Sequence, residues 1–311
     1  MSVPVTPPRG TPDGGTPDGG TPDGGTPARS TPSRITPRFT AAFERGLSEL
    51  PPTQALASAS GRFMSRGRLF AGAIYWLAWL STSRRAVVTA SVTRELQALG
   101  LDALRLVGSS SVLVGLIATF QVAYQLAPFG AEVMSIKAIG WFAARELGPL
   151  VTALLVIARS ASAIAGELAS MSTSAELDAL RAMDLDPVKY LVTPKLAALL
   201  VSLPGLTILS DALIAVGGWI GSVLVLGVGT TFYLEQFRES LTVQDIFVGL
   251  TKSVIFAVII AIVPADEGLS VNRRTGAIGA AATRAVVFST IGVLAADTLV
   301  NAVFYFIPRL L

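Results

Sequence analysis

Long apolar runs alternate with short polar segments from about residue 69 to the end of the chain. An α-helix needs about 20 predominantly apolar residues to cross the hydrocarbon core of a bilayer, and five of the runs are long enough. The pattern therefore predicts an all-α polytopic membrane protein, with a membrane domain over residues 67–311 and five transmembrane helices. The predicted spans are Leu106–Ala127, Ala138–Gly166, Val188–Leu226, Ile246–Val263 and Ala285–Ile307.

The third run, Val188–Leu226, is too long to be one straight span. Pro194 and Pro204 lie within it, so it is either one long bent helix or a span followed by a re-entrant piece. The segment after it, Thr230–Asp245, is polar and net acidic. The fourth span is followed by a glycine-rich stretch, Pro264–Ala282, which we expect to be a loop.

An earlier apolar segment, Leu69–Leu80, is too short to span a bilayer as a helix. It would cover about 18 Å of a hydrocarbon core about 30 Å thick. Trp76 and Trp79 are typical of the membrane interface, and arginines flank the segment on both sides. We expect an interfacial helix in the cytoplasmic leaflet. The alternative is a short span whose ends are completed by neighbouring segments.

A short polar segment, about Thr173 to Asp186, separates the second apolar run from the third, so it must lie at a membrane surface. Thr173 and Glu176 have the spacing of a capping box at the start of a helix. Asp186 and Pro187 are expected to end that helix, because the residue before a proline disfavours helical geometry.

This polar helix has an apolar stripe and a mainly acidic face. The stripe, at three-residue spacing, consists of Leu177, Leu180 and Met183. The charged residues that point in other directions are Glu176, Asp178, Arg181 and Asp184. A helix lying on anionic lipid would carry Lys and Arg on its polar face. The acidic excess therefore favours docking into a groove of a soluble protein over a plain membrane-surface helix.

Residues 1–66 have a composition that cannot form a packed core. The sequence TPDGG occurs three times from Thr11, and Thr-Pro pairs recur as far as Pro37. We expect a disordered tail and linker there. A transit peptide is a weaker interpretation, because such peptides are poor in acidic residues. No cleavable signal peptide is expected, since no apolar segment of the required kind occurs near the N-terminus.

The composition restricts the chemistry that this chain can perform. There is no cysteine and no histidine, which excludes disulfides, thiolate chemistry, histidine acid–base catalysis and the usual zinc sites. No GxxxxGK[ST] motif occurs, so the sequence carries no P-loop for a nucleotide. We expect a protein that is not an enzyme and that holds neither a metal nor a cofactor.

The distribution of Lys and Arg predicts the orientation in the membrane. With five spans, the three basic groups fall on one side, which is the cytoplasm. This puts the N-terminus in the cytoplasm and the C-terminus on the outer side. The three groups are Arg84, Arg85, Arg94 and Arg105; Arg181, Lys189 and Lys195; and Arg273, Arg274 and Arg284.

Charged residues inside apolar runs are candidates for function. Arg145 and Glu146 lie in the outer part of the second span, where they could pair with each other or a neighbour, and Arg145 could meet a lipid phosphate. The other intramembrane polar candidates are Arg159, Asp211, Lys252, Asp297 and Asn301. We interpret Arg159 as extending to the membrane surface, and the others as a structural polar clamp rather than a proton or ion relay. Small residues at 158–166 allow close helix packing, within the chain or between two copies.

Several separated motifs resemble one family. They are Arg-Glu-Leu-Gly-Pro from Arg145, Glu-Leu-Asp-Ala-Leu from Glu176, Pro-Lys-Leu from Pro194, the run from Gly276 to Val287, and Asp297 in the last span. With these motifs in this order, the chain resembles the MlaE/YrbE family, which comprises the permease subunits of MCE-associated ABC lipid transporters. The sequence departs from the family at Val263–Gly268, where a Gly-Cys-Tyr-like turn is common, and at Ala282, where the family has Thr.

The resemblance implies a homodimeric permease of the bacterial inner membrane with phospholipid or a related lipid as cargo. It implies cytoplasmic ATPase subunits that bind ATP and magnesium and dock on the polar helix, here a coupling helix, and an MCE-domain partner on the outer side. It also implies that Arg145 and Glu146 lie near the lipid cavity. Two other functions remain open: a membrane scaffold that transports nothing, and an ion-coupled secondary transporter using Asp211, Lys252 and Asp297.

Overall fold

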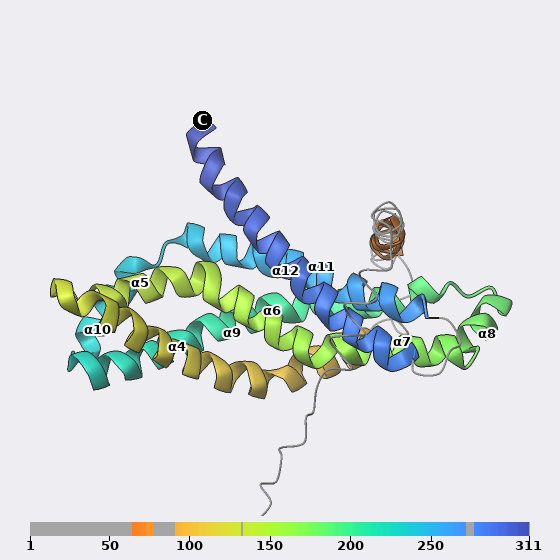
Figure 1. Cartoon of the computed structure of the whole chain (residues 1–311), viewed down its shortest axis with the longest axis horizontal. Helices are drawn as coiled ribbons and strands as arrows, with labels where there is room; N and C mark the ends of the chain where they lie inside the picture. The colour runs from red at the N-terminus through yellow and green to blue at the C-terminus, as the bar shows by residue number, and fades with distance from the viewer. Residues whose placement is uncertain (1–63, 77–90, 132, 272–276, 311) are drawn as a thin grey trace, which may run out of the picture. The chain divides into compact units, whose positions relative to one another are not determined.

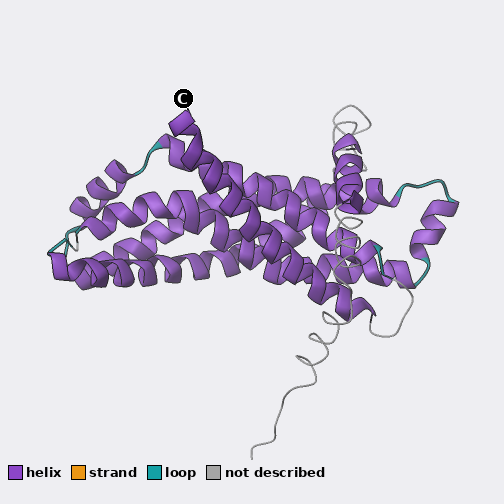
Figure 2. Cartoon of the chain, turned by 45° about the horizontal axis from the view of Figure 1, so that its top comes forward, coloured by secondary structure: helices purple, strands orange, loops and turns teal. Residues whose placement is uncertain are grey.

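The computed structural model of the protein describes residues 64–76, 91–131, 133–271 and 277–310, and every regular element within them is helical (Figures 1 and 2). Five helical runs are long and apolar enough to cross a membrane, which confirms the predicted number of spans. They cover Ser91–Phe129, Met134–Thr173, Val188–Leu226, Val243–Leu269 and Ala277–Phe306. The predicted tail and most of the linker, residues 1–63, lie outside the described residues.

The first two runs contain several turns of different pitch. The first comprises a helical segment at residues 91–95, then η1 (Leu96–Gly100), η2 (Leu101–Ala103), α4 (Leu104–Leu126) and η3 (Ala127–Phe129). The second comprises α5 (Met134–Phe142), η4 (Ala143–Leu147), α6 (Gly148–Val156), η5 (Ile157–Ala161) and α7 (Ser162–Thr173). Both η4 and η5 are π-helical, a wide turn that occurs mostly as a single-turn bulge inside α-helices and frequently at functional sites.

The remaining elements are α8 (Glu176–Ala182), η6 (Val188–Val192), α9 (Thr193–Leu226), α10 (Thr230–Ser240), α11 (Val243–Leu269) and α12 (Ala277–Leu310). Helix α8 lies at one end of the long helices and α10 at the other (Figures 1 and 2). The C-terminal part of α12 diverges from the other long helices (Figure 1). Residues 64–76 form a separate helix before the first span.

Helices α4 and α9 lie side by side with their backbones in close approach (Figure 1). A Cβ atom on Gly115 would meet the carbonyl oxygen of Ile214, and one on Gly217 would meet that of Val112. The hydroxyl groups of Ser111 and Ser210 are hydrogen-bonded at 2.8 Å in the same interface. Small residues permit this packing, which in a membrane depends on van der Waals contact rather than on the hydrophobic effect.

The apolar core lies where η5, α7, α9 and α11 meet. Leu168, Leu199, Phe256 and Ile260 are completely buried in it. Small side chains in the second run, such as Ala161, contribute to the same core. The small-residue stretch at 158–166 therefore packs at least partly within the chain.

The structure decides between the two interpretations of the third apolar run. Val188–Leu226 is one continuous helical run with Pro204 inside it, so there is no re-entrant piece. The expected loop over Pro264–Ala282 is wrong at both ends. Helix α11 continues through Pro264 to Leu269, and α12 begins at Ala277. The loop was expected from the glycine-rich composition, but the helix continues, and the side chains of Asp266 and Glu267 at its end are buried in ion pairs.

The polar segment after α9 also contains a helix that the sequence analysis did not specify. Helix α10 buries Tyr233, whose hydroxyl donates a hydrogen bond to the carbonyl oxygen of Ala215 at 2.7 Å. Burial raises the pKa of the Tyr233 phenol. Helix α10 packs on α5, where Lys137 and Glu239 form an exposed ion pair at 3.0 Å.

Candidate functional site

The site begins with Lys252, a lysine of α11 that is completely buried. Its Nζ atom lies 2.7 Å from Oε2 of Glu146 in η4 and 2.9 Å from Oδ1 of Asp297 in α12. The Nδ2 atom of Asn301 donates to Glu146 Oε2 and to Asp297 Oδ2, at 3.3 Å in each case. These four residues, named here the ionic cluster, connect three spans.

A second ion pair involves the residue next to Glu146. Nη1 of Arg145 lies 3.5 Å from Oδ1 of Asp245, near the start of α11. The guanidinium carbon of Arg145 is also 5.8 Å from the ring centre of Trp141, one turn earlier. The Arg145 side chain is 24% exposed, whereas that of Asp245 is 7% exposed. Arg145 is therefore the member of this pair that another molecule can reach.

The local backbone explains how adjacent residues can both reach α11. Pro149 has no N–H to donate to the carbonyl of Arg145, four residues earlier, so the regular ladder of hydrogen bonds is interrupted there. The chain forms the wide turn η4 at this point, with Arg145 and Glu146 in it. Gly249 lets α11 approach the turn, since a Cβ atom at that position would meet the carbonyl oxygen of Ala144. Lys252 is three residues further along α11, on the same face.

The positive and negative charges of the site do not cancel. Arg145 and Lys252 supply two positive charges, while Glu146, Asp245 and Asp297 supply three negative charges, so the five groups together carry one net negative charge when ionised. Isolated charges in a membrane interior are costly, and those that occur are paired with one another. The arrangement can therefore hold the helices together and can receive a positively charged group.

The structure brings together only some of the predicted intramembrane residues. Asp211 lies apart from the cluster, against Gly148, where a Cβ atom would meet its carboxylate. Its Oδ1 atom is buried without a hydrogen-bond partner among the described residues. Arg159, in η5, pairs with Asp102 at 3.4 Å, and its side chain is 33% exposed. Among the described residues, neither of the two forms a hydrogen bond or an ion pair with the ionic cluster.

The predicted polar helix is present but is shorter than expected. It is α8, Glu176–Ala182, and it ends before Asp186 and Pro187, which instead begin the next helix. Oδ1 of Asp186 accepts a hydrogen bond from the backbone N–H of Val188 at 2.9 Å, as an N-cap residue does. The expected end of the polar helix is thus the start of the third span.

The predicted capping box is wrong. Thr173 is the last residue of α7, and its hydroxyl donates to the carbonyl oxygen of Ser170 at 2.9 Å. Ala175 precedes α8 with a φ of 64° and makes no side-chain cap. The side chain of Glu176 instead accepts a hydrogen bond from Ser174 at 2.8 Å. The tight turn between α7 and α8 therefore replaces the capping box.

The side chains of α8 are mostly exposed. Leu177 is 3% exposed, Leu180 is half-buried, and Met183, just after α8, is 61% exposed. The predicted apolar stripe is therefore buried only at its first residue. The exposed charged residues in and just after α8 are Glu176, Asp178, Arg181 and Asp184.

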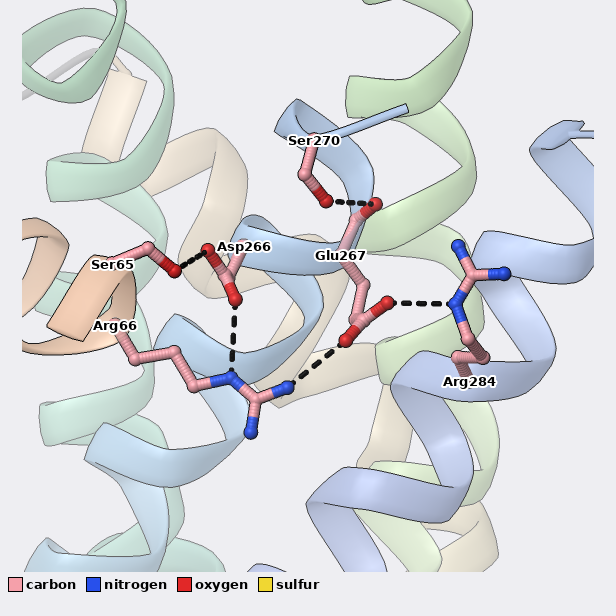
Figure 3. Close-up of polar contacts among 6 residues, drawn as sticks. All are labelled: Ser65, Arg66, Asp266, Glu267, Ser270 and Arg284. Carbon is pink, nitrogen blue, oxygen red and sulfur yellow. Dashed lines mark hydrogen bonds and ion pairs between the residues drawn. The ribbon is translucent and has the colours of Figure 1, made fainter. Parts of the chain in front are cut away.

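Two ionic groups near the α8 end were missed by the sequence analysis. In the first, Arg66 binds Asp266 at 3.1 Å and Glu267 at 2.9 Å, and Arg284 binds the other oxygen of Glu267 at 2.9 Å (Figure 3). We call these four residues the ionic clasp, because they tie the helix at residues 64–76 to α11 and α12. The sequence feature that could have indicated this group is the pair of adjacent acidic residues, Asp266 and Glu267, directly after an apolar run.

The second group is centred on Lys195, which is 3% exposed. Its Nζ atom lies 2.7 Å from Glu95 and 2.8 Å from Glu167. It connects the start of the first run, α7 and α9. From the sequence, Lys195 was interpreted as a marker of orientation and as part of the Pro-Lys-Leu motif, and no ion pair was predicted for it.

An open apolar cavity lies at the other end of the molecule from α8. Its volume is about 600 Å³, and it is lined by residues of α4, α9 and the segment after η3, among them Phe120, Tyr124, Val133 and Leu226. Tyr124 is 77% exposed. An apolar cavity near the end of two spans can accommodate hydrocarbon chains or an apolar surface of another protein.

Comparison with known proteins gives consistent matches over the membrane domain. The family model described as Permease MlaE matches residues 92–303. The intermembrane phospholipid transport system permease protein MlaE of Haemophilus influenzae is 30% identical over 69% of this chain and 82% of that protein. Probable ABC transporter permease proteins of Synechocystis and Rickettsia typhi are 32% and 29% identical, over 62% and 69% of this chain and 76% and 83% of those proteins.

Proposed function

The chain belongs to the MlaE permease family, and from this membership we propose that it moves phospholipid or a related lipid as the permease subunit of an ABC transporter. Its five apolar helices make it a membrane permease subunit. The observation that carries the lipid proposal is the ionic cluster, a charged group buried between membrane spans. The Haemophilus influenzae relative of this chain is named for phospholipid transport.

The polar residues of the site have separate tasks in this proposal. Arg145 contacts the lipid phosphate, because a guanidinium group binds phosphate with two parallel hydrogen bonds and this side chain is accessible. Glu146 and Asp297, whose side chains are 16% and 13% exposed, give the cluster its negative charge. Lys252, which is inaccessible, holds η4, α11 and α12 together.

Energy for transport comes, in this proposal, from separate cytoplasmic ATPase subunits, which bind ATP and magnesium. Helix α8 is the coupling helix on which they dock. Its support is the exposed acidic surface of α8 together with the exposed side chain of Met183. Because α8 lies in the short connection between α7 and η6, a displacement of α8 would move two spans directly.

The rest of the assembly follows from the same family. We propose a homodimer in the bacterial inner membrane, with the N-terminus in the cytoplasm, the C-terminus on the outer side, and an MCE-domain protein bound on that outer side. Helix 64–76 is interfacial in this arrangement, which fits its exposed Ile74 and Tyr75. The exposed apolar residues of α12, including Val287, Ile291 and Leu294, provide a surface for lipid or for the second copy.

The proposal is tested by purifying the tagged full-length chain with its native partners in a mild detergent. We expect an ABC ATPase to copurify, the complex to hydrolyse ATP, and mass spectrometry to detect bound phospholipid. Replacing Arg145 with Gln should lower the bound phospholipid while the ATPase is retained. Purification without lipid and without ATP hydrolysis would overturn the proposal in favour of a membrane scaffold.

A further inference from the structure

A second cavity, of about 410 Å³, lies where helix 64–76, α8 with the segment after it, and the end of α11 meet. Arg68 and Leu69 line it from the first element, Arg181 and Pro187 from the second, and Leu269 from the third. The third apolar run begins at Val188 and the fourth ends at Leu269. The cavity therefore lies where two apolar helical runs end, at the end of the molecule that carries α8.

The two carboxylates that line this cavity are already bound to protein donors. Oδ1 of Asp266 accepts from the Ser65 hydroxyl at 2.7 Å, and its Oδ2 pairs with Arg66 at 3.1 Å (Figure 3). Asp186 accepts from Trp76 Nε1 at 3.0 Å through one oxygen and from a backbone N–H through the other. These groups therefore build the wall of the cavity and have hydrogen bonds on both oxygens.

The two arginines that line the cavity form weaker contacts with other protein groups than the two carboxylates do. The described side-chain contact of Arg68 is with the sulfur of Met64 at 3.5 Å, and a thioether is a weak acceptor. Arg181 pairs with Asp178 at 3.4 Å, but both side chains are more than 60% exposed, so this pair contributes little. Two guanidinium groups from different elements thus border one cavity and can turn toward a ligand.

The chemistry of the cavity fits a lipid headgroup. One guanidinium group can bind a phosphate group through two parallel hydrogen bonds. Basic pockets between helices at the membrane surface bind acidic lipid headgroups. The remaining wall includes Leu69, Pro187 and Leu269, apolar side chains that a free phosphate ion would not use. We propose that this cavity binds the headgroup phosphate of an anionic phospholipid, at a site that shares no residue with the ionic cluster.

A lipid at this position would link three elements that the chain connects only through long segments. It would contact Arg181 of α8, Arg68 of helix 64–76, and the end of α11 beside the ionic clasp. The lipid composition of the membrane would thereby influence how firmly α8 is held. None of the residues that line this cavity belongs to the ionic cluster, so the proposal does not depend on whether the cargo proposal is correct.

Photocrosslinking in nanodiscs tests the proposal on the full-length chain. The photoreactive residue p-benzoylphenylalanine replaces Leu269, and crosslinked lipid is measured by mass spectrometry in nanodiscs of phosphatidylcholine with or without phosphatidylglycerol. Arginines at a membrane surface strengthen binding of anionic lipid, and two of them correspond to an enrichment of at least about tenfold. We expect phosphatidylglycerol to be enriched by that factor over phosphatidylcholine.

The variants identify the source of the binding. The double variant Arg68→Gln/Arg181→Gln should lose the enrichment, whereas Arg238→Gln, at an exposed arginine of α10, should keep it. Arg145→Gln, the variant expected to lower the amount of bound cargo lipid, should also keep the enrichment, which separates this site from the cargo site. Two results would overturn the proposal. One is equal crosslinking of both lipids by the photoreactive chain that retains Arg68 and Arg181, and the other is full enrichment in the double variant. Equal crosslinking of both lipids, combined with binding of inorganic phosphate that the double variant loses, would assign the cavity to free phosphate instead.

Discussion

Nζ of Lys252 lies 2.7 Å from Oε2 of Glu146, although the two residues are 106 positions apart in the chain. The contact joins α11 to the wide turn η4, and Asp297 of α12 completes it from the other side. A buried charge of this kind is retained only with its partners, since removal of one partner leaves the others uncompensated. The pair is therefore both a structural connection and the centre of the candidate site.

Replacing Lys252 with Met should strongly destabilise the protein. The substitution leaves Glu146 and Asp297 facing each other without a counter-charge, and breaking a buried pair costs about 3–5 kcal/mol in soluble proteins. The measurement is the thermal unfolding temperature in detergent. The matched control is Lys137→Met, which removes an ion pair whose side chains are 45% and 61% exposed and should change little. Equal unfolding temperatures for the two variants would contradict the prediction.

Replacing Gly249 with Ala should destabilise the protein although alanine favours helices. The new methyl group would meet the carbonyl oxygen of Ala144 and push α11 away from η4, weakening the contact of Lys252 with Glu146. The control is Gly205→Ala in α9, where no atom lies within 4 Å of the added carbon. That variant should be neutral or more stable by up to about 1 kcal/mol. A loss of stability in both variants, or in neither, would count against the proposed close approach.

The number of spans could be predicted because the thickness of a bilayer fixes the length of an apolar run. The ends of the helices could not, because they depend on distant partners. The glycine-rich composition suggested a loop after Pro264, but α11 continues to Leu269, and Arg66, about 200 positions earlier, binds both Asp266 and Glu267 near its end. No local pattern contains that information.

The candidate site was predictable in its members but not in its pairing. The cost of charge in a membrane pointed to Glu146, Lys252, Asp297 and Asn301, and the structure joins these four. The same rule also selected Asp211, which lies elsewhere. The partner of Arg145 was missed, since Asp245 was assigned to a polar connection rather than to the start of a span. Three of the residues predicted for the polar clamp, Lys252, Asp297 and Asn301, are therefore in contact with one another's partners, with Glu146 as an additional member and without Asp211.

Replacing Arg66 with Gln should loosen helix 64–76. This arginine contacts both carboxylates of the ionic clasp, whereas Glu267 keeps Arg284 when Arg66 is removed. We expect faster amide hydrogen exchange in residues 64–76, with little change in the spans, because local opening depends on local contacts. Arg68→Gln on the same helix, measured in detergent without anionic lipid, is the control. Unchanged exchange in Arg66→Gln would show that other contacts hold this helix.

Reversing the charges of α8 tests its proposed docking role. Glu176 and Asp178 are exposed on the acidic side of α8, and close charge pairs across protein interfaces have coupling energies of about 1.5–7 kcal/mol. Glu176→Lys/Asp178→Lys should therefore lower recovery of the ATPase subunit at least about tenfold, in a pull-down of the full-length permease. The amount of permease in the membrane fraction should not change, since neither side chain is buried.

The matched control reverses two acidic residues at the other end of the molecule. Glu235 and Glu239 are exposed on α10, one helical turn apart, so Glu235→Lys/Glu239→Lys makes the same change in net charge. Recovery of the ATPase should be unaffected by this variant, because α10 and α8 lie at opposite ends of the long helices (Figure 1). If both double variants lowered recovery equally, net charge rather than the surface of α8 would determine the interaction. If neither did, the ATPase would dock elsewhere, and the exposed acidic side of α8 would need another partner.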